Sequence, residues 1–247
     1  MGFERRSLVL NQGRTILAID SSTERSGVAL YDGDDFSELT WDAGRNQTST
    51  LSVEVMHLLA LAHVELRDLG AIAVAIGPGS FNGLRVGLSV AKGLCFGLQI
   101  PICGVGTLDV VAYPHAASRS PIRAFVRAGR GRAVYADYRH RNGRWVRATE
   151  LRNEPFDAVA GQLAERTIIV GEMPGELAAK LADESLAVLP SPALRLRRPS
   201  YLAEIGYRRW QAGDTDPLET LEPIYVHGVA SSGSSDANAT TAVRSTD

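Results

Sequence analysis

The chain has 247 residues, of which 45% are hydrophobic and 22% are charged, and its formal net charge is −2. This composition is typical of a globular protein with a sizeable core, and the charge balance argues against a surface built as a whole for nucleic acid. No stretch is long and apolar enough for a signal peptide or a membrane span, so we predict a cytoplasmic protein that does not contact membranes. The two cysteines, Cys95 and Cys103, lie among apolar neighbours, which favours reduced, buried thiols.

Hydrophobic periodicity predicts a regular order of elements in the first half of the chain. In chain order we expect strands at 15–20, 27–32 and 36–41, a helix at 48–65, a strand at 71–76 and a helix at 81–98. The predicted unit is therefore βββαβα.

A weaker copy of this order follows. We expect strands at 122–128, 132–140 and 143–149, a helix at 156–165, a strand at 167–171, a helix from Gly175 and a last helix at 199–213. Duplication of a βββαβα unit predicts an α/β protein with an actin-like, Hsp70-like (ASKHA) fold of two lobes, the second degenerate. The predicted parts are an N-terminal lobe at 14–108, a C-terminal lobe at 109–198, a segment at 199–228 that folds back on the N-terminal lobe, and a disordered tail at 229–247.

The turn "GPGS" between the strand at 71–76 and the next helix has two interpretations. In one, its backbone amides and the turn "DSST" after the first strand hold a phosphate or a hydrated cation. In the other, Ser80 caps the helix and no ligand is needed, because no Walker pattern is present and the glycine spacing differs from the dinucleotide fingerprint. The candidate phosphate residues are Asp20, Ser21, Ser22, Thr23, Gly77, Gly79 and Ser80.

The two helices of the first unit have more apolar or small surface than one sheet requires. In the helix at 81–98, Gly83, Gly87 and Ala91 recur every four residues, although an interior glycine costs about 1 kcal/mol relative to alanine. The helix at 48–65 has one apolar stripe for its own sheet and a second one on nearly the opposite side, formed by Val53, Met56, Ala60 and Val64. Either the helix at 199–213 covers this second stripe, or a partner protein does.

Recognisable catalytic groups are missing from the sequence. No pair among His57, His63, His115, His140 and His227 has the spacing of a helical metal site. No nucleophile elbow, Cys/His protease signature or kinase signature occurs either. We therefore predict a protein that is not an enzyme and that holds no metal or other cofactor.

Several segments together resemble the TsaB family, also called YeaZ. They are "ILAIDSSTERSGVALYDG", "AGRNQTSTL", "AIAVAIGPGSFNGLRVGLSVAKGLCFGLQIPICGVGTLDVVA" and "LEPIYVHG". The resemblance implies an actin-like fold without catalysis, acting in the synthesis of N6-threonylcarbamoyladenosine at position 37 of transfer RNA. It also implies a TsaD-type transferase as partner, a TsaE-type ATPase that joins the complex, and transfer RNA bound through the complex.

The same resemblance implies which surface the partner covers. Members of the family pair with the transferase, or with a second copy of themselves, through the helices that correspond to 48–65 and 81–98. The expected interface residues are Val53, Met56, Ala60, Val64, Gly83, Gly87 and Ala91. On this interpretation the glycines permit close packing of helices at a shared interface.

This sequence departs from the family pattern in places. Gln47 stands where the family usually has histidine, Asn82 where it has threonine, and Arg127 where it has aspartate, while His227 replaces the terminal arginine. A role that depended on the acidic residue is therefore in doubt in this chain. The rival functions are an ATPase or phosphotransferase of the same fold, for which Asp20 is the one acidic candidate, and a protease, for which no metal pair or nucleophile is found.

The segment 119–152 is rich in arginine. It has ten arginines against two carboxylates, Asp137 and Glu150, which leaves a net charge of +8. The simpler interpretation is a solvated arginine-rich face. The alternative is a contact with transfer RNA phosphates, for which the candidates are Arg139, Arg144 and Arg147.

Overall fold

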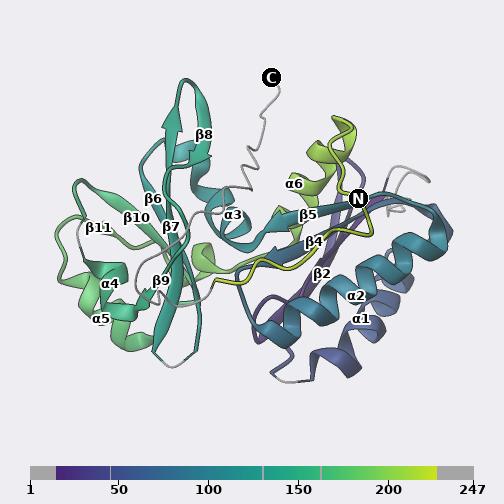
Figure 1. The fold of residues 1–247 in the computed structure, drawn as a ribbon, viewed down its shortest axis with the longest axis horizontal. Helices are drawn as coiled ribbons and strands as arrows, with labels where there is room; N and C mark the ends of the chain where they lie inside the picture. Colours follow the sequence, from purple (N-terminus) through teal and green to yellow (C-terminus); the bar gives the residue numbers. More distant parts are fainter. Residues whose placement is uncertain (1–14, 45, 130, 162, 227–247) are drawn as a thin grey trace, which may run out of the picture. The chain divides into compact units, whose positions relative to one another are not determined.

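The computed structural model describes residues 15–226 except 45, 130 and 162, and it leaves the side chain of Arg144 undescribed (Figure 1). The predicted tail at 229–247 and His227 lie outside the described residues. The chain divides into two compact units. Among the described residues, the first consists of residues 15–107 together with Arg198–Ile224, and the second of Leu108–Arg197 together with Tyr225 and Val226.

The first unit is a five-stranded sheet with helices on both faces. Its elements are β1 (Thr15–Asp20), β2 (Arg25–Tyr31), β3 (Phe36–Asp42), α1 (Gln47–Leu61), η1 (Leu66–Asp68), β4 (Leu69–Gly77), α2 (Phe81–Leu98), β5 (Ile102–Gly106) and α6 (Pro199–Gln211). The strand order is β3-β2-β1-β4-β5, in which the first three strands are antiparallel and β1, β4 and β5 are parallel. Figure 1 shows α1 and α2 side by side on this sheet.

The second unit repeats this topology with shorter helices. Its elements are α3 (Thr107–Ala112), η2 (Tyr113–Ser118), β6 (Ile122–Arg127), β7 (Arg132–Arg141), β8 (Arg144–Arg147), β9 (Arg152–Pro155), α4 (Phe156–Ala160), β10 (Thr167–Gly171), α5 (Gly175–Ala182), β11 (Ala187–Val188) and η3 (Pro192–Arg195). The strand order is β11-β10-β6-β7-β8, with β9 paired to β7. Because β6 pairs antiparallel with β7 and parallel with β10, it takes the place of β1, and the predicted duplication is confirmed.

The core of the first unit explains why its central strand is apolar from end to end. Every residue of β1 is buried, which a strand with helices on both faces requires. On one face β1 and its neighbours pack against the inner stripes of α1 and α2, including Leu51, Leu58 and Leu88. On the other face α6 crosses β1, β2 and β4, and a Cβ on Gly206 would lie 2.4 Å from the Cβ of Ala73.

This position of α6 decides one of the alternatives left open by the sequence. Since α6 lies on the face of the sheet opposite α1 and α2, it does not cover the second apolar stripe of α1. The segment that follows α6 runs back past the start of β5 to the end of β4 instead. There the Asp216 N–H donates to the Ile102 carbonyl at 2.9 Å, and the Ile224 N–H donates to the Ile76 carbonyl at 2.7 Å.

The ends of some predicted elements were wrong. The first helix ends at Leu61 rather than near residue 65, and α4 has five residues where ten were predicted. The third strand of the second unit is split into β8 and β9. Over the residues that the structure describes, no helix is both long and apolar enough to cross a membrane.

Candidate functional site

The turn between β1 and β2 is closed on itself by hydrogen bonds. The N–H and the Oγ–H of Ser22 both donate to Asp20 Oδ1, at 3.0 and 2.6 Å. Asp20, Ser21, Ser22 and Thr23 are all buried. The side chain of Gln47, at the start of α1, donates from Nε2 to the Thr23 carbonyl at 2.9 Å. The buried Gln47 is therefore a structural bridge between α1 and this turn.

The same turn is docked against the start of α2. The Ser80 N–H donates to the Ser22 carbonyl at 2.7 Å, and Ser21 Oγ donates to the Gly83 carbonyl at 2.8 Å. Ser80 is the N-cap of the helix, because its Oγ accepts the Gly83 N–H at 3.3 Å. The N-terminal turn of α2 is thus joined to the β1–β2 turn backbone to backbone.

The glycines of α2 make this contact possible. A Cβ on Gly79 would lie 2.1 Å from the Ser22 carbonyl oxygen, and a Cβ on Gly83 would lie 2.1 Å from the Ser21 carbonyl oxygen. A Cβ on Gly87 would lie 2.3 Å from Ser21 Oγ. These distances are shorter than any real contact of a Cβ atom, so a larger residue cannot be placed there without a shift of the backbone.

This geometry corrects the expected role of the small residues in α2. Gly83, Gly87 and Ala91 are buried and face their own unit, so they are not available to a partner. The prediction that they form a subunit interface was wrong. The periodicity of small residues identified a close approach, but the approaching group is the β1–β2 turn, 62 residues away from Gly83 in the sequence.

A phosphate group does not fit the candidate residues of the two turns. The Ser22 carbonyl accepts the Ser80 N–H, so this amide of the α2 N-terminus has a protein oxygen where an anion would bind. Asp20, Ser21, Ser22 and Thr23 are buried, and Gly77 packs against the Ile224 carbonyl. Gly77, Gly79 and Ser80 therefore form a structural turn, which favours the second interpretation of "GPGS".

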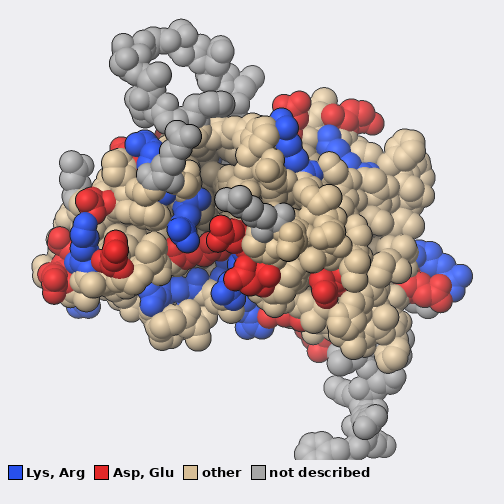
Figure 2. All heavy atoms as spheres, turned by 90° about the horizontal axis from the view of Figure 1, so that it is seen from below, with Lys and Arg blue, Asp and Glu red and all other residues tan. Residues whose placement is uncertain are grey.

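The outer face of α1 carries exposed apolar side chains. Val53 is 62% exposed and Met56 is 53% exposed, and Ala60 is exposed on the same face. Val64 differs, because α1 ends at Leu61 and Val64 is buried in the core of the first unit. The inclusion of Val64 in the interface was therefore wrong, since it rested on a helix extended to residue 65. The part of Figure 2 over α1 and α2 is mostly tan, with few charged side chains.

Three further exposed apolar side chains of these helices were missed from the sequence. Leu61 of α1 is 58% exposed, and on α2 Phe81 and Phe96 are 50% and 71% exposed. The guanidinium of Arg85 lies 3.8 Å from the centre of the Phe81 ring. A signal for Phe96 was present, because it follows Ser89 by seven residues, which is close to two helical turns, and so lies on the same exposed side of that helix. Both helices thus present apolar side chains to solvent.

The candidate arginines of the second unit do not act as one group. Arg139 Nη1 lies 2.6 Å from Glu165 Oε1, so its charge has a partner. Arg147 pairs in register with Tyr138, the neighbour of Arg139, and the side chains of Arg147 and Arg139 therefore point to opposite faces of the sheet. The side chain of Arg144 lies outside the described part of the structure. Arg139 and Arg147 therefore do not share one face of the sheet, and the contact of these arginines with transfer RNA stays a prediction.

The titratable side chains show no catalytic arrangement within the described residues. His115 and His140 each bond a backbone carbonyl through Nε2, at 3.0 Å to Leu194 and 2.9 Å to Ala116, and burial lowers the pKa of His115. Burial raises the pKa of the Cys95 and Cys103 thiols to about 12, which makes them poor nucleophiles. In the described part of the chain no group of three or more His, Cys, Asp or Glu could hold a metal ion.

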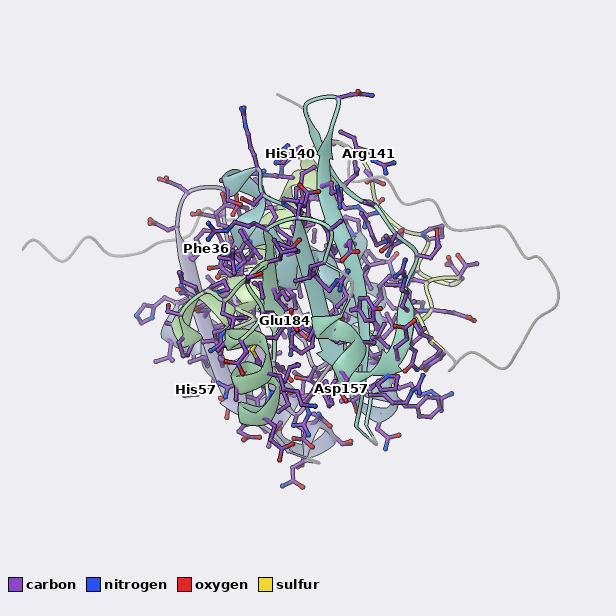
Figure 3. The ribbon with its side chains drawn as sticks, turned by 90° about the vertical axis from the view of Figure 1, so that its left-hand side faces the viewer. Phe36, His57, His140, Arg141, Asp157 and Glu184 are labelled. Atoms are coloured by element: carbon purple, nitrogen blue, oxygen red, sulfur yellow. The ribbon has the colours of Figure 1, made fainter. Side chains whose placement is uncertain are left out.

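A cavity of about 380 Å³ lies between α4 and α5, where Figure 3 shows Asp157 and Glu184. Its lining residues are Asp157, Ala160, Gly161, Lys180, Asp183 and Glu184. Lys180 pairs with Asp157, and both side chains are largely exposed. The cavity is therefore a hydrated, charged surface rather than an enclosed binding site.

Comparison with known proteins places this geometry in a family. A family model described as TsaD, tRNA N6-adenosine threonylcarbamoyltransferase, matches residues 41–198. The tRNA threonylcarbamoyladenosine biosynthesis protein TsaB of Escherichia coli (strain K12) is 31% identical over 219 residues, which cover 85% of this chain and 94% of that protein. TsaB of Bacillus subtilis (strain 168) is 35% identical over 130 residues, covering 52% of this chain and 57% of that protein.

A solved structure shows the same fold. YeaZ from Pseudomonas aeruginosa aligns with a TM-score of 0.70 and 26% sequence identity, covering 86% of this chain and 99% of that one. Two units of one βββαβα topology define an α/β protein of the actin-like class, here with the β1–β2 turn closed by the protein's own backbone. The chain belongs to the TsaB family, also called YeaZ, of tRNA threonylcarbamoyladenosine biosynthesis proteins. The family expected from the sequence is thereby confirmed.

Proposed function

We propose that this protein is a non-catalytic subunit that binds and stabilises a TsaD-type transferase during the threonylcarbamoylation of transfer RNA. The observation that carries the proposal is the exposed apolar outer face of α1, with Val53 and Met56 both more than half exposed. Exposed side chains of this kind, gathered on one element, are typical of a protein–protein interface. A role in the synthesis of threonylcarbamoyladenosine on transfer RNA is supported by the relatives of the chain, which are named as biosynthesis proteins of that nucleoside.

The proposed interface consists of the outer faces of α1 and α2. Its members are Val53, Met56, Ala60 and Leu61 on α1, and Phe81 and Phe96 on α2. Aromatic residues and methionine are enriched at the centres of interfaces, because they bury large apolar areas. A TsaE-type ATPase would join this complex, and a second copy of the chain would use the same face when the transferase is absent.

The non-catalytic role is supported by what the β1–β2 turn does. Its carbonyl oxygens and Asp20 are engaged by the protein itself, so they are not placed to bind or activate a nucleotide. An ATPase or phosphotransferase would need these groups free to face the phosphates or their metal ion. The ATPase interpretation, which the sequence left as the main rival, therefore has no geometric support.

The test is light scattering on a sizing column, with the protein alone and mixed with the TsaD-type subunit of the same cell. We expect a stable heterodimer for the wild type and its loss for the Met56→Glu/Ala60→Glu variant. The matched control is Leu194→Glu, because Leu194 is an exposed apolar side chain of the second unit, 57% exposed, and its substitution should leave the heterodimer intact.

Two results would overturn the proposal. The first is that the wild type forms no complex with the transferase under any salt or nucleotide condition. The second is that the Met56→Glu/Ala60→Glu variant forms the complex as well as the wild type does, which would place the interface elsewhere. Light scattering of the protein alone at several concentrations reports whether the same two substitutions also abolish a homodimer.

A further inference from the structure

The first sheet has two edges, and the chain treats them differently. At β5 the segment that follows α6 bonds the outer backbone: the Asp216 N–H donates to the Ile102 carbonyl at 2.9 Å, and Asp216 Oδ2 accepts the Gly104 N–H at 2.7 Å. At the other edge β3 pairs with β2 over all seven of its residues, and among the described residues it pairs with no other strand. The backbone N–H and C=O groups on the outer side of β3 are therefore left to solvent or to a partner.

β3 lacks the features by which proteins usually protect an edge strand. Its sequence, FSELTWD, contains no proline and no lysine, and its register with β2 has no bulge. The charge in its middle, Glu38, is turned to the start of α6, where the carboxylate bonds Arg198 and accepts the Ser200 N–H at 3.2 Å. The edge is therefore long, regular and open to a further strand.

The two faces of β3 differ in chemistry. Leu39 and Trp41 are partly buried on the face that packs against α1, where Trp41 Nε1 donates to Thr50 Oγ1 at 3.4 Å. Phe36 lies on the opposite face, is 40% exposed, and its ring stacks on that of Tyr31 with the ring centres 4.0 Å apart (Figure 3). A strand that fits this edge needs apolar side chains on the first face and can carry polar ones on the second.

The turn that precedes β3 is acidic and is held in one shape. Asp32 Oδ1 accepts the N–H groups of Asp34 and Asp35 at 3.0 and 2.9 Å, and the Tyr207 hydroxyl of α6 donates to the Asp32 carbonyl at 3.1 Å. Asp34 and Asp35 are exposed, and among the described residues neither carboxylate takes part in an ion pair. The turn therefore places two unpaired negative charges beside the start of the open edge.

We propose that the free edge of β3 is a docking site for an extended, basic segment of a partner protein, which pairs with β3 as a sixth strand of the first sheet. Backbone hydrogen bonds to β3 hold the segment, and its basic side chains on the face of Phe36 pair with Asp34 and Asp35. Arginine is favoured beside Phe36, because its planar guanidinium stacks on an aromatic ring. The inference does not depend on the proposed function, which uses the outer faces of α1 and α2.

The charges at this edge select the occupant. Transfer RNA is repelled by Asp34 and Asp35, and it has no strand to add. A second copy of the chain would pair β3 with β3 in antiparallel orientation, which brings the acidic turn of each copy beside Asp42 of the other. Because like charges opposite each other destabilise a strand pair, a basic segment fits this edge better than a second copy does.

The test measures the binding of three labelled peptides to the full chain by fluorescence anisotropy at about 0.1 M salt. Each peptide matches the seven residues of β3 in length. The first alternates arginine and valine, the second alternates glutamate and valine, and the third is the first peptide N-methylated at every residue. Methylation leaves the charge unchanged and removes the N–H groups that a sixth strand donates to β3.

The variant is Asp34→Asn/Asp35→Asn, and the matched control is Asp183→Asn/Glu184→Gln, which removes the same charge from two exposed carboxylates of the second unit. We expect the arginine–valine peptide to bind the wild type at least about tenfold more tightly than either other peptide does. The variant should weaken this binding about fivefold, because exposed ion pairs each contribute little, and the control should bind like the wild type.

Four results would overturn the inference. In the first, the arginine–valine peptide does not bind, or the glutamate–valine peptide binds as well. In the second, the N-methylated peptide binds equally well, which would show attraction between charges without strand pairing. In the third, the control loses as much affinity as the variant. In the fourth, light scattering shows a homodimer that the arginine–valine peptide dissociates, which would assign the edge to a second copy. The heterodimer with the transferase is measured separately, so none of these results bears on the proposed function.

Discussion

In each unit a helix is attached next to the equivalent central strand, β1 in the first unit and β6 in the second, but the attaching contacts differ. In the first unit the turn after β1 contacts α2 through backbone groups, with carbonyl oxygens of Ser21 and Ser22 in the space that side chains at Gly79 and Gly83 would fill. In the second unit β6 takes the place of β1, and the side chain of Arg123 makes the connection. It bonds Asp137 on β7 and donates from Nη1 to the Val159 and Gly161 carbonyls at 3.2 and 2.8 Å, at the end of α4.

The difference shows how a duplicated unit can keep its topology while its packing changes. Backbone contact excludes both water and ligands, and it restricts several positions of the helix to glycine. A buried arginine spans a larger gap and satisfies the carbonyls at a helix end, but it requires a carboxylate to balance its charge. The first solution accompanies the 18-residue helix α2, the second helix of its unit, and the second accompanies the five-residue helix α4, which is the first helix of its unit and the counterpart of α1. The following predictions test this contrast, from the largest expected effect to the smallest.

Removal of the Asp137 carboxylate should give the largest effect. The side chains of Arg123 and Asp137 are 6% and 17% exposed, and their shortest contact is 2.7 Å. Asp137→Ala leaves a buried guanidinium without its counter-charge, and we expect a loss of about 3 to 5 kcal/mol in the free energy of unfolding. Urea unfolding followed by fluorescence would measure it.

The matched control for this prediction is Arg139→Ala on the same strand. Arg139 and Glu165 form an ion pair whose side chains are 43% and 49% exposed, so its removal should change the free energy of unfolding by less than about 1 kcal/mol. If Asp137→Ala were no more destabilising than Arg139→Ala, the buried ion pair of Arg123 and Asp137 would not be what attaches α4 to the second sheet.

Gly83→Ala should be the next most destabilising change. The added methyl group would overlap the Ser21 carbonyl oxygen at 2.1 Å, so α2 must move away from the β1–β2 turn. We expect a loss of about 2 to 3 kcal/mol, measured by the same urea unfolding. Gly175→Ala in α5 is the control, because a Cβ there has no atom within 4 Å. Equal losses in the free energy of unfolding at the two positions would show that the contact between α2 and the β1–β2 turn does not require glycine at position 83.

These two contacts, of the β1–β2 turn with α2 and of Arg123 with the end of α4, also show how much of the structure the sequence could predict. Strand and helix order predicted the duplicated fold, because apolar periodicity records which face of an element is buried. The contact between Ser21 and Gly83 could not be predicted, since periodicity shows that one side of α2 is nearly bare backbone but not what approaches it. The sequence therefore placed a partner protein where the structure places the protein's own turn.

The arginines illustrate the same limit in the second unit. Composition identified a basic segment correctly, but the strand register decides which residues share a face. Arg147 lies opposite Tyr138 and not opposite Arg139, and Glu165, which pairs with Arg139, comes 26 residues later. Both facts depend on strand pairing and loop geometry, which a count of charges does not contain.

A rise in pH from about 8.5 to about 9.5 should weaken the first unit, because both cysteines of the chain, Cys95 and Cys103, belong to it. Burial raises the pKa of each thiol to about 12, against about 8.5 in an unfolded chain. Between these values the unfolded state loses a proton that the folded state keeps, so stability falls as pH rises, by at most about 1.4 kcal/mol per pH unit and thiol.

The measurement is the free energy of unfolding between about pH 8.5 and about pH 9.5, just above the unfolded thiol pKa, for the wild type and for Cys103→Ala. The variant starts from a lower stability, because it lacks buried sulfur, but its dependence on pH should be shallower. The same slope in both proteins would mean that the Cys103 thiol is not protonated preferentially in the folded state.

The smallest expected effect concerns Gly93, on the outer face of α2. Unlike at Gly83, a Cβ at this position would have no atom within 4 Å, so nothing within the described chain requires glycine there. Gly93→Ala should raise the free energy of unfolding of the isolated protein by about 0.5 to 1 kcal/mol, since alanine is the better helix former. If the transferase packs closely on this face, the same methyl group should weaken the heterodimer while it stabilises the subunit. A variant that is more stable and binds equally well would limit the interface to α1 and to the exposed phenylalanines of α2.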